Sequence, residues 1–440
     1  MLQALLNAFK LPDLRRKLLF TFGILVAFRF IAHVPVPGIP VKALEDLFAN
    51  NPLLGMLDLF SGGAMRNFSI AAMGVYPYIT ASIIMQLLVP VIPRLEALSK
   101  EGEAGRNKIN QITHWLTVPL AILQGYGQLA LLQNSQQAVP VEDQMHLWWF
   151  GQPAEFFLPT FTMLLTMAAG TMICVWLGEL ITEHGIGNGV SIIIFGGIVA
   201  TLPAMFGQSL LAGGTGGGII GLVVFAVLGL ATVVAIVVFQ EAQRRIPVQY
   251  AKRIRGTKMY GGQSSHIPLR VNSAGMIPLI FAMSIMVFPG QLASYFALAS
   301  TPWIASAARF VSTVFSMSSW FYWVFYFLLV VMFTFFYTMV IFQQQRLSEN
   351  LQKYGGFIPG IRPGRPTEEY LNRVLYRITV AGAVFLGLVA IMPFLASQAT
   401  NVQALQLGST GLLIVVGVVL DTMKQLEAQL LMRHYEGFIK

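Results

Sequence analysis

Charged residues are scarce in this sequence. Of its 440 residues only 11% are Asp, Glu, Lys or Arg, whereas 55% are hydrophobic. Soluble globular proteins carry about 25% charged residues, so the composition excludes an ordinary soluble domain. Many apolar stretches reach the length of about 20 residues that crosses a hydrocarbon core as a helix. Long, strictly alternating segments of the kind that a membrane β-barrel needs are missing. The sequence therefore predicts an all-α polytopic membrane protein.

Cysteine and the common catalytic motifs are also missing or nearly so. The single cysteine, Cys174, lies in an apolar run and cannot form an internal disulfide, so we expect a buried thiol that packs like a small hydrophobe. The six histidines are scattered, without an HExxH or a Cys/His cluster. The segment EGEAGRNK lacks the Walker A spacing, and no GxSxG motif occurs. We expect no metal, no cofactor and no enzymatic activity.

Hydropathy predicts ten membrane spans. They lie near residues 18–33, 70–90, 112–132, 158–181, 190–207, 217–240, 273–290, 320–342, 374–396 and 408–423. Ten spans divide into two sets of five, in an N-terminal half (1–207) and a C-terminal half (208–440). Because five is odd, the second set enters the membrane in the opposite sense to the first. Inverted halves are common in transport proteins and place the pathway at their interface, although the two halves show no convincing sequence repeat.

The basic residues predict the orientation. If the N-terminus is cytoplasmic, the segments on that side hold 24 of the 28 Lys and Arg residues. The other four are Arg29, Lys42, Arg66 and Arg309. This bias follows the positive-inside rule, and it predicts that both termini are cytoplasmic.

The stretch LDLFSGGAMRNFSIAAMG (57–74) is polar and glycine-rich, yet it runs directly into an apolar span. One interpretation is an ordinary external loop. The other is a re-entrant segment, because polar backbone at membrane depth is tolerated only where it lines a cavity. Gly62 and Gly63 would permit a tight and mobile turn.

Two long basic segments face the predicted cytoplasmic side, at 244–272 and 345–373. Both are rich in Gly, Pro and Tyr. They could be solvated loops that only set topology, but they are longer than topology requires. Basic surfaces of this kind suit a large anionic partner.

The span centres offer little for ion coupling. The acidic candidates Glu179, Glu183 and Asp421 fall at the cytoplasmic ends of spans, and only neutral polar groups lie deeper. A secondary transporter of a small solute usually buries charge at the midplane. The lack of such charge argues against a secondary transporter, which we keep as the alternative interpretation.

Seven motifs in order carry a resemblance to a known family. They read FSGGAMRNFSIAAMGVYPYITASIIMQLL, EGEAGRNKINQ, GIGNGVSIIIFGGIVA, RRIPVQYAKR, SSHIPLRVNSAGMIPLIFA, YGGFIPGIRPG and GSTGLLIVVGVVLD. Together they closely resemble the SecY/Sec61 family of protein-conducting channels, in its bacterial form. The resemblance implies ten transmembrane helices in two inverted halves around a central pore. It also implies passage of unfolded polypeptides across the plasma membrane and lateral release of hydrophobic segments.

The resemblance assigns roles to individual residues. It implies a re-entrant plug helix at about 57–67, including Phe60, Ser61, Gly62, Gly63, Ala64, Met65, Arg66 and Asn67. An apolar pore ring falls on Val75, Ile79, Val190, Ile194, Ile280 and Ile414. A lateral gate between spans 2 and 7, flanked by spans 3 and 8, takes its polar residues from Thr80, Gln86, Gln124 and Asn272. For each gate residue, simple hydrogen bonding between helices is the competing interpretation.

The resemblance also implies partners. The basic residues Arg244, Arg245, Lys252, Arg253, Lys258 and Arg362 resemble a docking surface for the translating ribosome and the SecA motor ATPase. The other implied partners are the SecE and SecG subunits, substrates with signal sequences, membrane lipid, and YidC and SecDF. Because no nucleotide site is visible in this chain, the driving energy must come from a partner.

Overall fold

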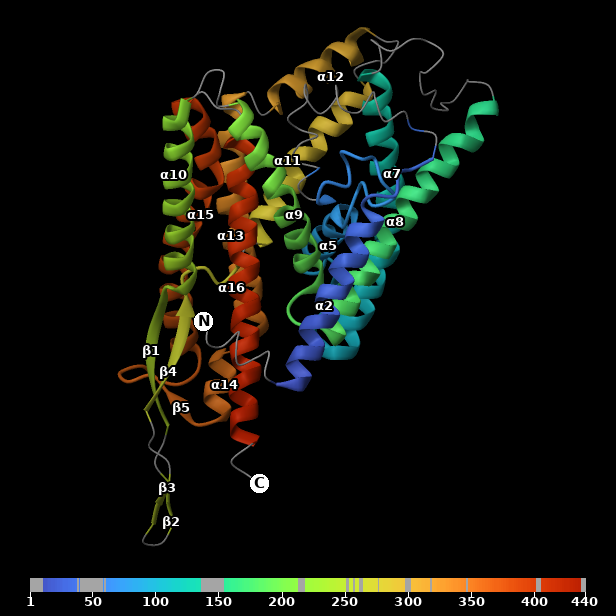
Figure 1. The fold of residues 1–440 in the computed structure, drawn as a ribbon. Helices are drawn as coiled ribbons and strands as arrows, with labels where there is room; N and C mark the ends of the chain where they lie inside the picture. The colour runs from blue at the N-terminus through green and yellow to red at the C-terminus, as the bar shows by residue number, and fades with distance from the viewer. Residues whose placement is uncertain are drawn as a thin grey trace.

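The computed structural model describes residues 11–37, 39, 58, 61–135, 154–212, 218–250, 253–255, 258–260, 264–275, 277–296, 302–316, 319–345, 347–400 and 405–436. This part of the chain is mostly helical (Figure 1). Its α-helices are α2 (Pro12–Ile31), α5 (Tyr76–Leu88), α6 (Pro93–Lys100), α7 (Glu103–Ser135), α8 (Phe157–His184), α9 (Gly189–Ala212), α10 (Gly218–Glu241), α11 (Ile277–Phe296), α12 (Pro302–Val314), α13 (Trp320–Gln345), α14 (Leu347–Lys353), α15 (Arg365–Thr400) and α16 (Leu405–Glu436), and a 3₁₀ turn, η3 (Ala154–Phe156), precedes α8.

A helix lies at each of the ten predicted spans, namely α2, α5, α7 to α11, α13, α15 and α16. Judged by length and composition, three helices among the described residues are apolar enough to cross a membrane: Phe157–His184, Trp320–Lys353 and Arg365–Met392. The pair α5 and α6 would make a fourth candidate, but it is bent by 99°. Pro90 and Pro93 lie at that bend, and proline cannot continue a helix because it lacks the N–H and clashes with the preceding turn.

Large apolar side chains remain exposed along several of these helices. Phe22 on α2 is 64% exposed, Leu165 on α8 57% and Leu230 on α10 69%. A helix that is apolar all round belongs either in the core of a large protein or in a membrane. Because these side chains point away from the protein core, their surroundings are expected to be lipid.

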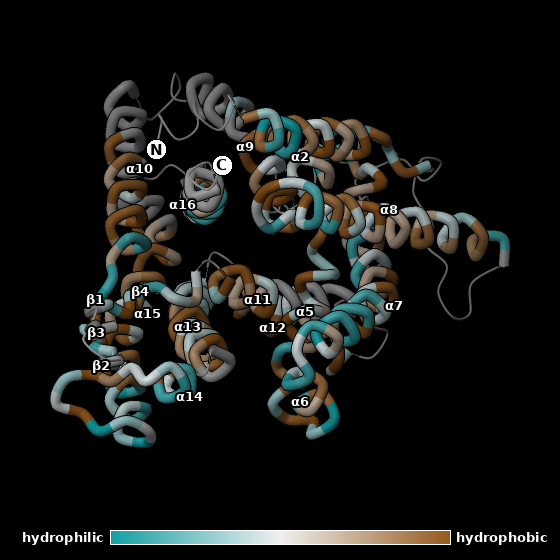
Figure 2. Tube along the Cα trace, turned by 90° about the horizontal axis from the view of Figure 1, so that it is seen from below, coloured by the Kyte–Doolittle hydropathy of each residue, from teal (hydrophilic) through white to brown (hydrophobic). Residues whose placement is uncertain are grey.

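The helices form two groups that follow the sequence. In the first group α2 packs on α8 and α9, α7 packs on α8, and α5 packs on α7. In the second group α13 packs on α11 and α15, and α16 packs on α10 and α15. Figure 2 shows both groups end-on, with α16 between α10 and the α2–α9 pair.

Two seams join the groups. At one seam α5 and α7 contact α11, and at the other α9 contacts α16. One large hydrophobic cluster runs through both groups and includes residues of α2, α5, α9, α11, α13 and α16. The seams are where the two groups of helices meet, and they position the candidate site.

The basic segment 244–272 is folded as a hairpin. Strands β1 (Gln243–Tyr250) and β4 (Ser264–Arg270) pair antiparallel, from Gln243 opposite Arg270 to Gln249 opposite Ser264. Beyond them β2 (Arg253–Arg255) pairs with β3 (Lys258–Tyr260). The hairpin projects from the end of the molecule where α2 begins and α16 ends, opposite α12 (Figure 1).

The second basic segment is not one long loop. It contains α14, the two-residue strand β5 (Gly356–Phe357) and the first turns of α15. Strand β5 pairs with β1 and completes a three-stranded sheet in the order β4, β1, β5. A separate small hydrophobic core joins the two segments; its buried members are Ile246, Val248, Leu269, Leu351, Ile358 and Leu371. The prediction of two long loops is corrected here, because alternating apolar residues in β1 bury one face.

Candidate functional site

The six residues of the proposed pore ring lie in one hydrophobic cluster. Val75 precedes α5, Ile79 lies in α5, Val190 and Ile194 lie in α9, Ile280 in α11 and Ile414 in α16. Four of them are almost fully buried, with exposures of 0% for Val75, 6% for Ile79, 2% for Ile194 and 3% for Ile414, and the other two pack against the cluster half-buried. The cluster contains many other aliphatic side chains, so burial alone does not single out these six.

The polar stretch before α5 lies against this cluster and is compact. From Gly62 to Val75 it forms turns, and Ala64 and Ala71 are buried in the cluster that holds the ring residues. The expectation of a plug helix is therefore wrong for residues 62–67. The reason is visible in the backbone, since Gly62 (φ +68°) and Gly63 (φ +82°) are in the left-handed region that an α-helix cannot accommodate. Phe60 lies outside the described residues.

Asp58 and Ser61 hold this turn together from within. The Asp58 carboxylate accepts a hydrogen bond from the Arg66 backbone N–H at 2.9 Å, and its carbonyl accepts one from the Gly63 N–H at 2.9 Å. The Ser61 hydroxyl donates to the Asp58 carbonyl at 3.1 Å and accepts from the Met65 N–H at 3.0 Å. Residues 61–66 are therefore held to Asp58 in a compact, internally hydrogen-bonded turn and do not form a loose loop.

The turn is held close to α2 and α9. A Cβ atom built on Gly62 would collide with the Cα of Gly197 in α9, so the two backbones touch where neither residue has a side chain. The guanidinium of Arg29 in α2 donates a hydrogen bond to the Gly62 carbonyl. Farther along, the Ile70 N–H donates to the Val34 carbonyl at 2.9 Å.

Two of the four proposed gate residues meet. The Gln124 amide in α7 donates to the Thr80 hydroxyl in α5 at 3.3 Å. Gln86 instead donates to Ser82 within α5 at 3.3 Å. The Asn272 amide donates to the Gly275 carbonyl at 3.0 Å, in the turn before α11. Thr80 and Gln124 therefore share a bond between α5 and α7, whereas Gln86 and Asn272 are engaged locally.

A bond across the α5–α11 seam was not foreseen from the sequence. The Tyr76 hydroxyl, at the first turn of α5, donates to the Ser284 carbonyl of α11 at 3.1 Å, and the bond is buried. Tyr76 is 2% exposed and Ser284 2%. A buried phenol needs a hydrogen-bond partner, so a tyrosine at the entry of an apolar span was a signal, although nothing local in the sequence identifies the partner.

The basic residues proposed for docking that the structure describes lie along the hairpin and in the turn before α15. Arg244 and Arg245 are exposed on β1, and Arg362 is exposed in the turn before α15. Arg253 and Lys258 lie on the short strands β2 and β3 at the hairpin tip. Lys252 lies outside the described residues. The β1–β5 pairing brings the two basic segments into one surface.

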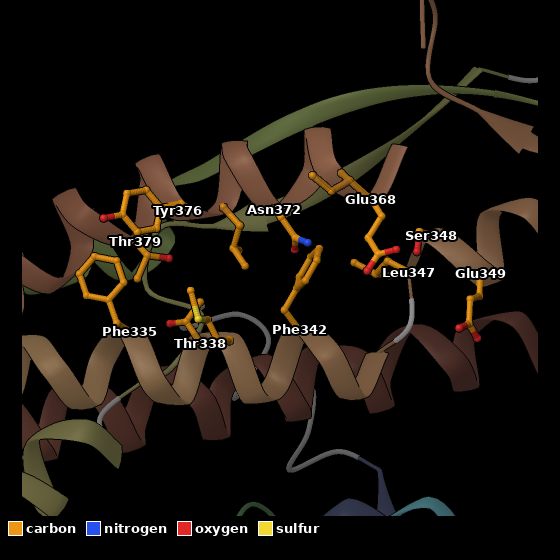
Figure 3. A pocket seen from close by; sticks show the side chains of 13 residues that line it. Phe335, Thr338, Phe342, Leu347, Ser348, Glu349, Glu368, Asn372, Tyr376 and Thr379 are labelled. Carbon is orange, nitrogen blue, oxygen red and sulfur yellow. The ribbon is translucent and has the colours of Figure 1, made fainter. Parts of the chain in front are cut away.

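A cavity of about 450 Å³ opens beside this surface, between α13 and α15 with α14 at its end. Phe335, Phe342 and Leu371 contribute its apolar wall, and Glu368 and Asn372 its polar side. Figure 3 shows Phe342 and Asn372 pointing toward one another across it.

Comparison with known proteins agrees with the resemblance seen in the motifs. The family model described as SecY matches residues 69–423. The protein translocase subunit SecY of Streptomyces galbus is 46% identical over 445 residues, which cover 100% of both chains.

Solved structures show the same fold. A SecY channel, whose study reports that its plug domain stabilises the closed state and maintains a membrane seal, superposes with a TM-score of 0.61 at 18% identity, over 94% of this chain and 92% of that one. Canine Sec61, in a ribosome–channel complex from the endoplasmic reticulum, superposes with a TM-score of 0.57 at 18% identity, over the same shares of the two chains. The resemblance is thereby confirmed: this chain belongs to the SecY family of protein translocase subunits.

Proposed function

We propose that this protein is the conduit of a bacterial Sec translocase, through which unfolded polypeptides cross the plasma membrane and hydrophobic segments leave sideways into lipid. The observation that carries the proposal is the cluster at the seams. Six β-branched side chains from both groups lie in one hydrophobic cluster, and Ala64 and Ala71 of the turn before α5 are buried in the same cluster. The chain is a channel subunit and not an enzyme, in keeping with its family.

The ring suits passage of a polypeptide for a physical reason. Val and Ile side chains offer no hydrogen-bond donors or acceptors, so a moving chain finds no fixed partner among them. In the absence of a chain, an apolar constriction resists water and ions by dewetting. In this proposal the turn at 61–67 fills the space on the outer side of the ring as a plug.

In this proposal the two groups of helices form the two halves, 1–207 and 208–440. Ten spans with inverted halves account for the distribution of the basic residues, and both termini are then cytoplasmic. The α5–α11 seam is the lateral gate in this proposal. Polar bonds at that seam can be exchanged for bonds to water or to the entering chain, so opening there costs less than opening a purely apolar seam.

The basic hairpin and the Arg362 turn are the docking surface. Exposed Arg244, Arg245 and Arg362 present positive charge on a sheet that α14 and β5 brace. Such a surface attracts ribosomal RNA phosphates and acidic protein surfaces. The Sec61 neighbour was solved with a ribosome, which supports the ribosome as one partner here. SecA, SecE, SecG, YidC and SecDF follow only from family membership.

A stalled secretory chain tests the proposal. A photoreactive residue is placed at each ring position in turn, and at Leu230 on the lipid-exposed face of α10 as the matched control. The proposal predicts that the stalled chain crosslinks to the ring positions and not to position 230. Crosslinking to position 230 alone, or to no position while the chain is translocated, would contradict the pathway.

The alternative, a secondary transporter of a small solute, requires a residue that couples ions. The acidic residue Glu179 is already engaged by His114, with the imidazole Nε2 2.7 Å from the carboxylate Oε1, and so is poorly placed to couple ions. Solute uptake into liposomes in a fixed ratio to an ion would favour this alternative.

A further inference from the structure

Arg29 is unusual among the basic residues of the chain. It is one of the four that lie outside the predicted cytoplasmic segments. Arg66 and Arg309 in that set are exposed, whereas Arg29 is half-buried in the last turn of α2. Burial of an arginine beside apolar helices is unfavourable unless its donors are satisfied. Its environment therefore indicates a specific role.

The Arg29 guanidinium finds a hydrogen-bond acceptor in the turn at residues 61–67. It donates to the carbonyl of Gly62, 33 residues away along the chain. Among the hydrogen bonds between described residues, this one joins residues 61–67 to α2 through a side chain. Residues 61–67 also make apolar contacts with neighbouring helices: Gly62 lies against Gly197, and Ala64 and Met65 are buried in hydrophobic clusters with helix side chains. A glycine–glycine contact fits closely but has little directional preference.

The charges around the turn favour the position of the Arg29 guanidinium. The buried carboxylate of Asp58 accepts the Arg66 N–H, and the positive charges of Arg66 and Arg29 both lie near enough to stabilise it. Arg29 thus touches the turn at a carbonyl and attracts the carboxylate that closes the turn. Charge-assisted hydrogen bonds are stronger than neutral ones, and removal of the guanidinium would leave the Gly62 carbonyl with a weaker hold on α2.

We propose that Arg29 is the positioning residue that latches the plug segment in the closed channel, by its bond to the Gly62 carbonyl. Opening breaks this bond, and water in the widened pathway then solvates both groups, so the latch is reversible. The inference rests on the proposed function, because it assumes that residues 57–67 seal the channel.

Ion conductance of the purified complex in planar bilayers, without substrate, tests the latch. Four proteins are compared: the parent, Arg29→Met, a deletion of residues 57–67, and the two changes combined. Arg29→Met keeps the length and apolar stem of the side chain but removes the charge and the donors. Arg309→Met is the matched control, since it removes one charge from an exposed position on α12.

The proposal predicts that Arg29→Met raises the open fraction about tenfold, the size expected for loss of one charged hydrogen bond, and that Arg29→Lys restores most of the closure. It also predicts that Arg29→Met adds nothing in the plug-deleted channel, because a latch acts only through what it holds. Arg309→Met should behave as the parent. If Arg29→Met fails to accumulate in the membrane, Arg29→Gln takes its place in the same four-way comparison.

The outcomes separate the latch from the plug. If the plug deletion is as ion-tight as the parent, the sealing role of residues 57–67 is wrong. If the deletion leaks while Arg29→Met remains tight, the plug stands and the latch is wrong. An equal increase in conductance from Arg29→Met in the presence and absence of the plug also overturns the latch, because Arg29 would then act elsewhere.

A labelling experiment gives a readout that does not depend on conductance. Ser61, which is 1% exposed, is changed to Cys in a Cys174→Ala background, and an impermeant maleimide is added from outside. The latch predicts about tenfold faster labelling when Arg29→Met is introduced. An unchanged labelling rate would contradict it.

Discussion

The two seams that join the helix groups differ in chemistry. The α5–α11 seam contains a buried hydrogen bond from Tyr76 to Ser284 and lies beside the Gln124–Thr80 pair. The seam between the groups at α16 is closed, near the start of α2, by an apolar cluster whose buried members are Leu14, Ile186, Met423 and Leu426. Separation of apolar surfaces loses burial that water cannot replace, whereas water can replace a hydrogen bond at modest net cost. The first seam is therefore suited to open and the second to act as the hinge.

The largest expected effect breaks the apolar seam. Ile186 is 2% exposed, and Ile186→Asp would place a carboxylate between α2 and α16 with no partner in its cluster. We expect a loss on the order of 4 kcal/mol in stability, measured as a fall in the thermal unfolding midpoint in detergent. Ile186→Val is the control, with an expected cost of about 1 kcal/mol. Equal stability of the two variants would show that the apolar cluster does not hold the groups together.

An intermediate effect is expected at the polar seam. Tyr76→Phe removes the hydroxyl that donates to Ser284 and keeps the ring. Loss of about 1 kcal/mol from the closed state corresponds to a roughly fivefold shift toward opening. Export of a secretory protein with a weakened signal sequence should therefore increase.

The control for this prediction is Tyr78→Phe, the same chemical change two residues away. The Tyr78 ring packs on His114, with ring centroids 5.4 Å apart, and so faces α7 rather than α11. Equal export from the two variants would show that the bond across the seam does not restrain the gate.

The smallest expected effect is a change of the ion leak with pH, through Asp58 in the turn before α5. Burial raises the pKa of the Asp58 carboxyl above 3.8, and the Arg66 N–H and the charges of Arg66 and Arg29 oppose this rise. Since the docked turn then binds a proton more tightly than the released turn, docking is favoured at low pH. This advantage is lost as the pH rises through the raised pKa. Acidification of the outer chamber toward pH 4 should therefore slightly reduce the residual leak.

Asp58→Asn should abolish this pH dependence and keep the leak low, because an amide oxygen can still accept the Arg66 N–H. Asp58→Ala should leak more at every pH, because the turn loses that acceptor. A leak that rises on acidification of the parent would contradict the sign of the shift.

The sequence predicted the helices well because hydropathy is a local property. A helix lies at each expected span. The second span was predicted to begin too early, because residues 70–75 form turns and α5 begins at Tyr76, whereas α7, α15 and α16 continue beyond the apolar run. The form of the segment at 62–67 was predicted wrongly. Its helix was implied by family resemblance, whereas the positive φ angles of Gly62 and Gly63 require turns.

What the sequence could not show depends on contacts between distant residues. Tyr76 and Ser284 are 208 residues apart, and Arg29 meets Gly62 only because α2 and α9 enclose the turn. Likewise, no local pattern reveals that β5 would pair with β1 and join the two basic segments. Six aliphatic ring positions could be named only by resemblance, since burial and periodicity are the same for their neighbours.

The most direct test of the account clamps each seam separately. In a Cys174→Ala background, cysteines at positions 76 and 284 are joined by a short bifunctional thiol reagent, and cysteines at 186 and 423 are joined in a second protein. Translocation of a secretory chain into vesicles is then measured before and after the clamp is cleaved. The account predicts that the 76–284 clamp blocks translocation reversibly and that the 186–423 clamp leaves it near the unclamped rate. A block from the 186–423 clamp, with free passage through the 76–284 clamp, would contradict the assignment of gate and hinge.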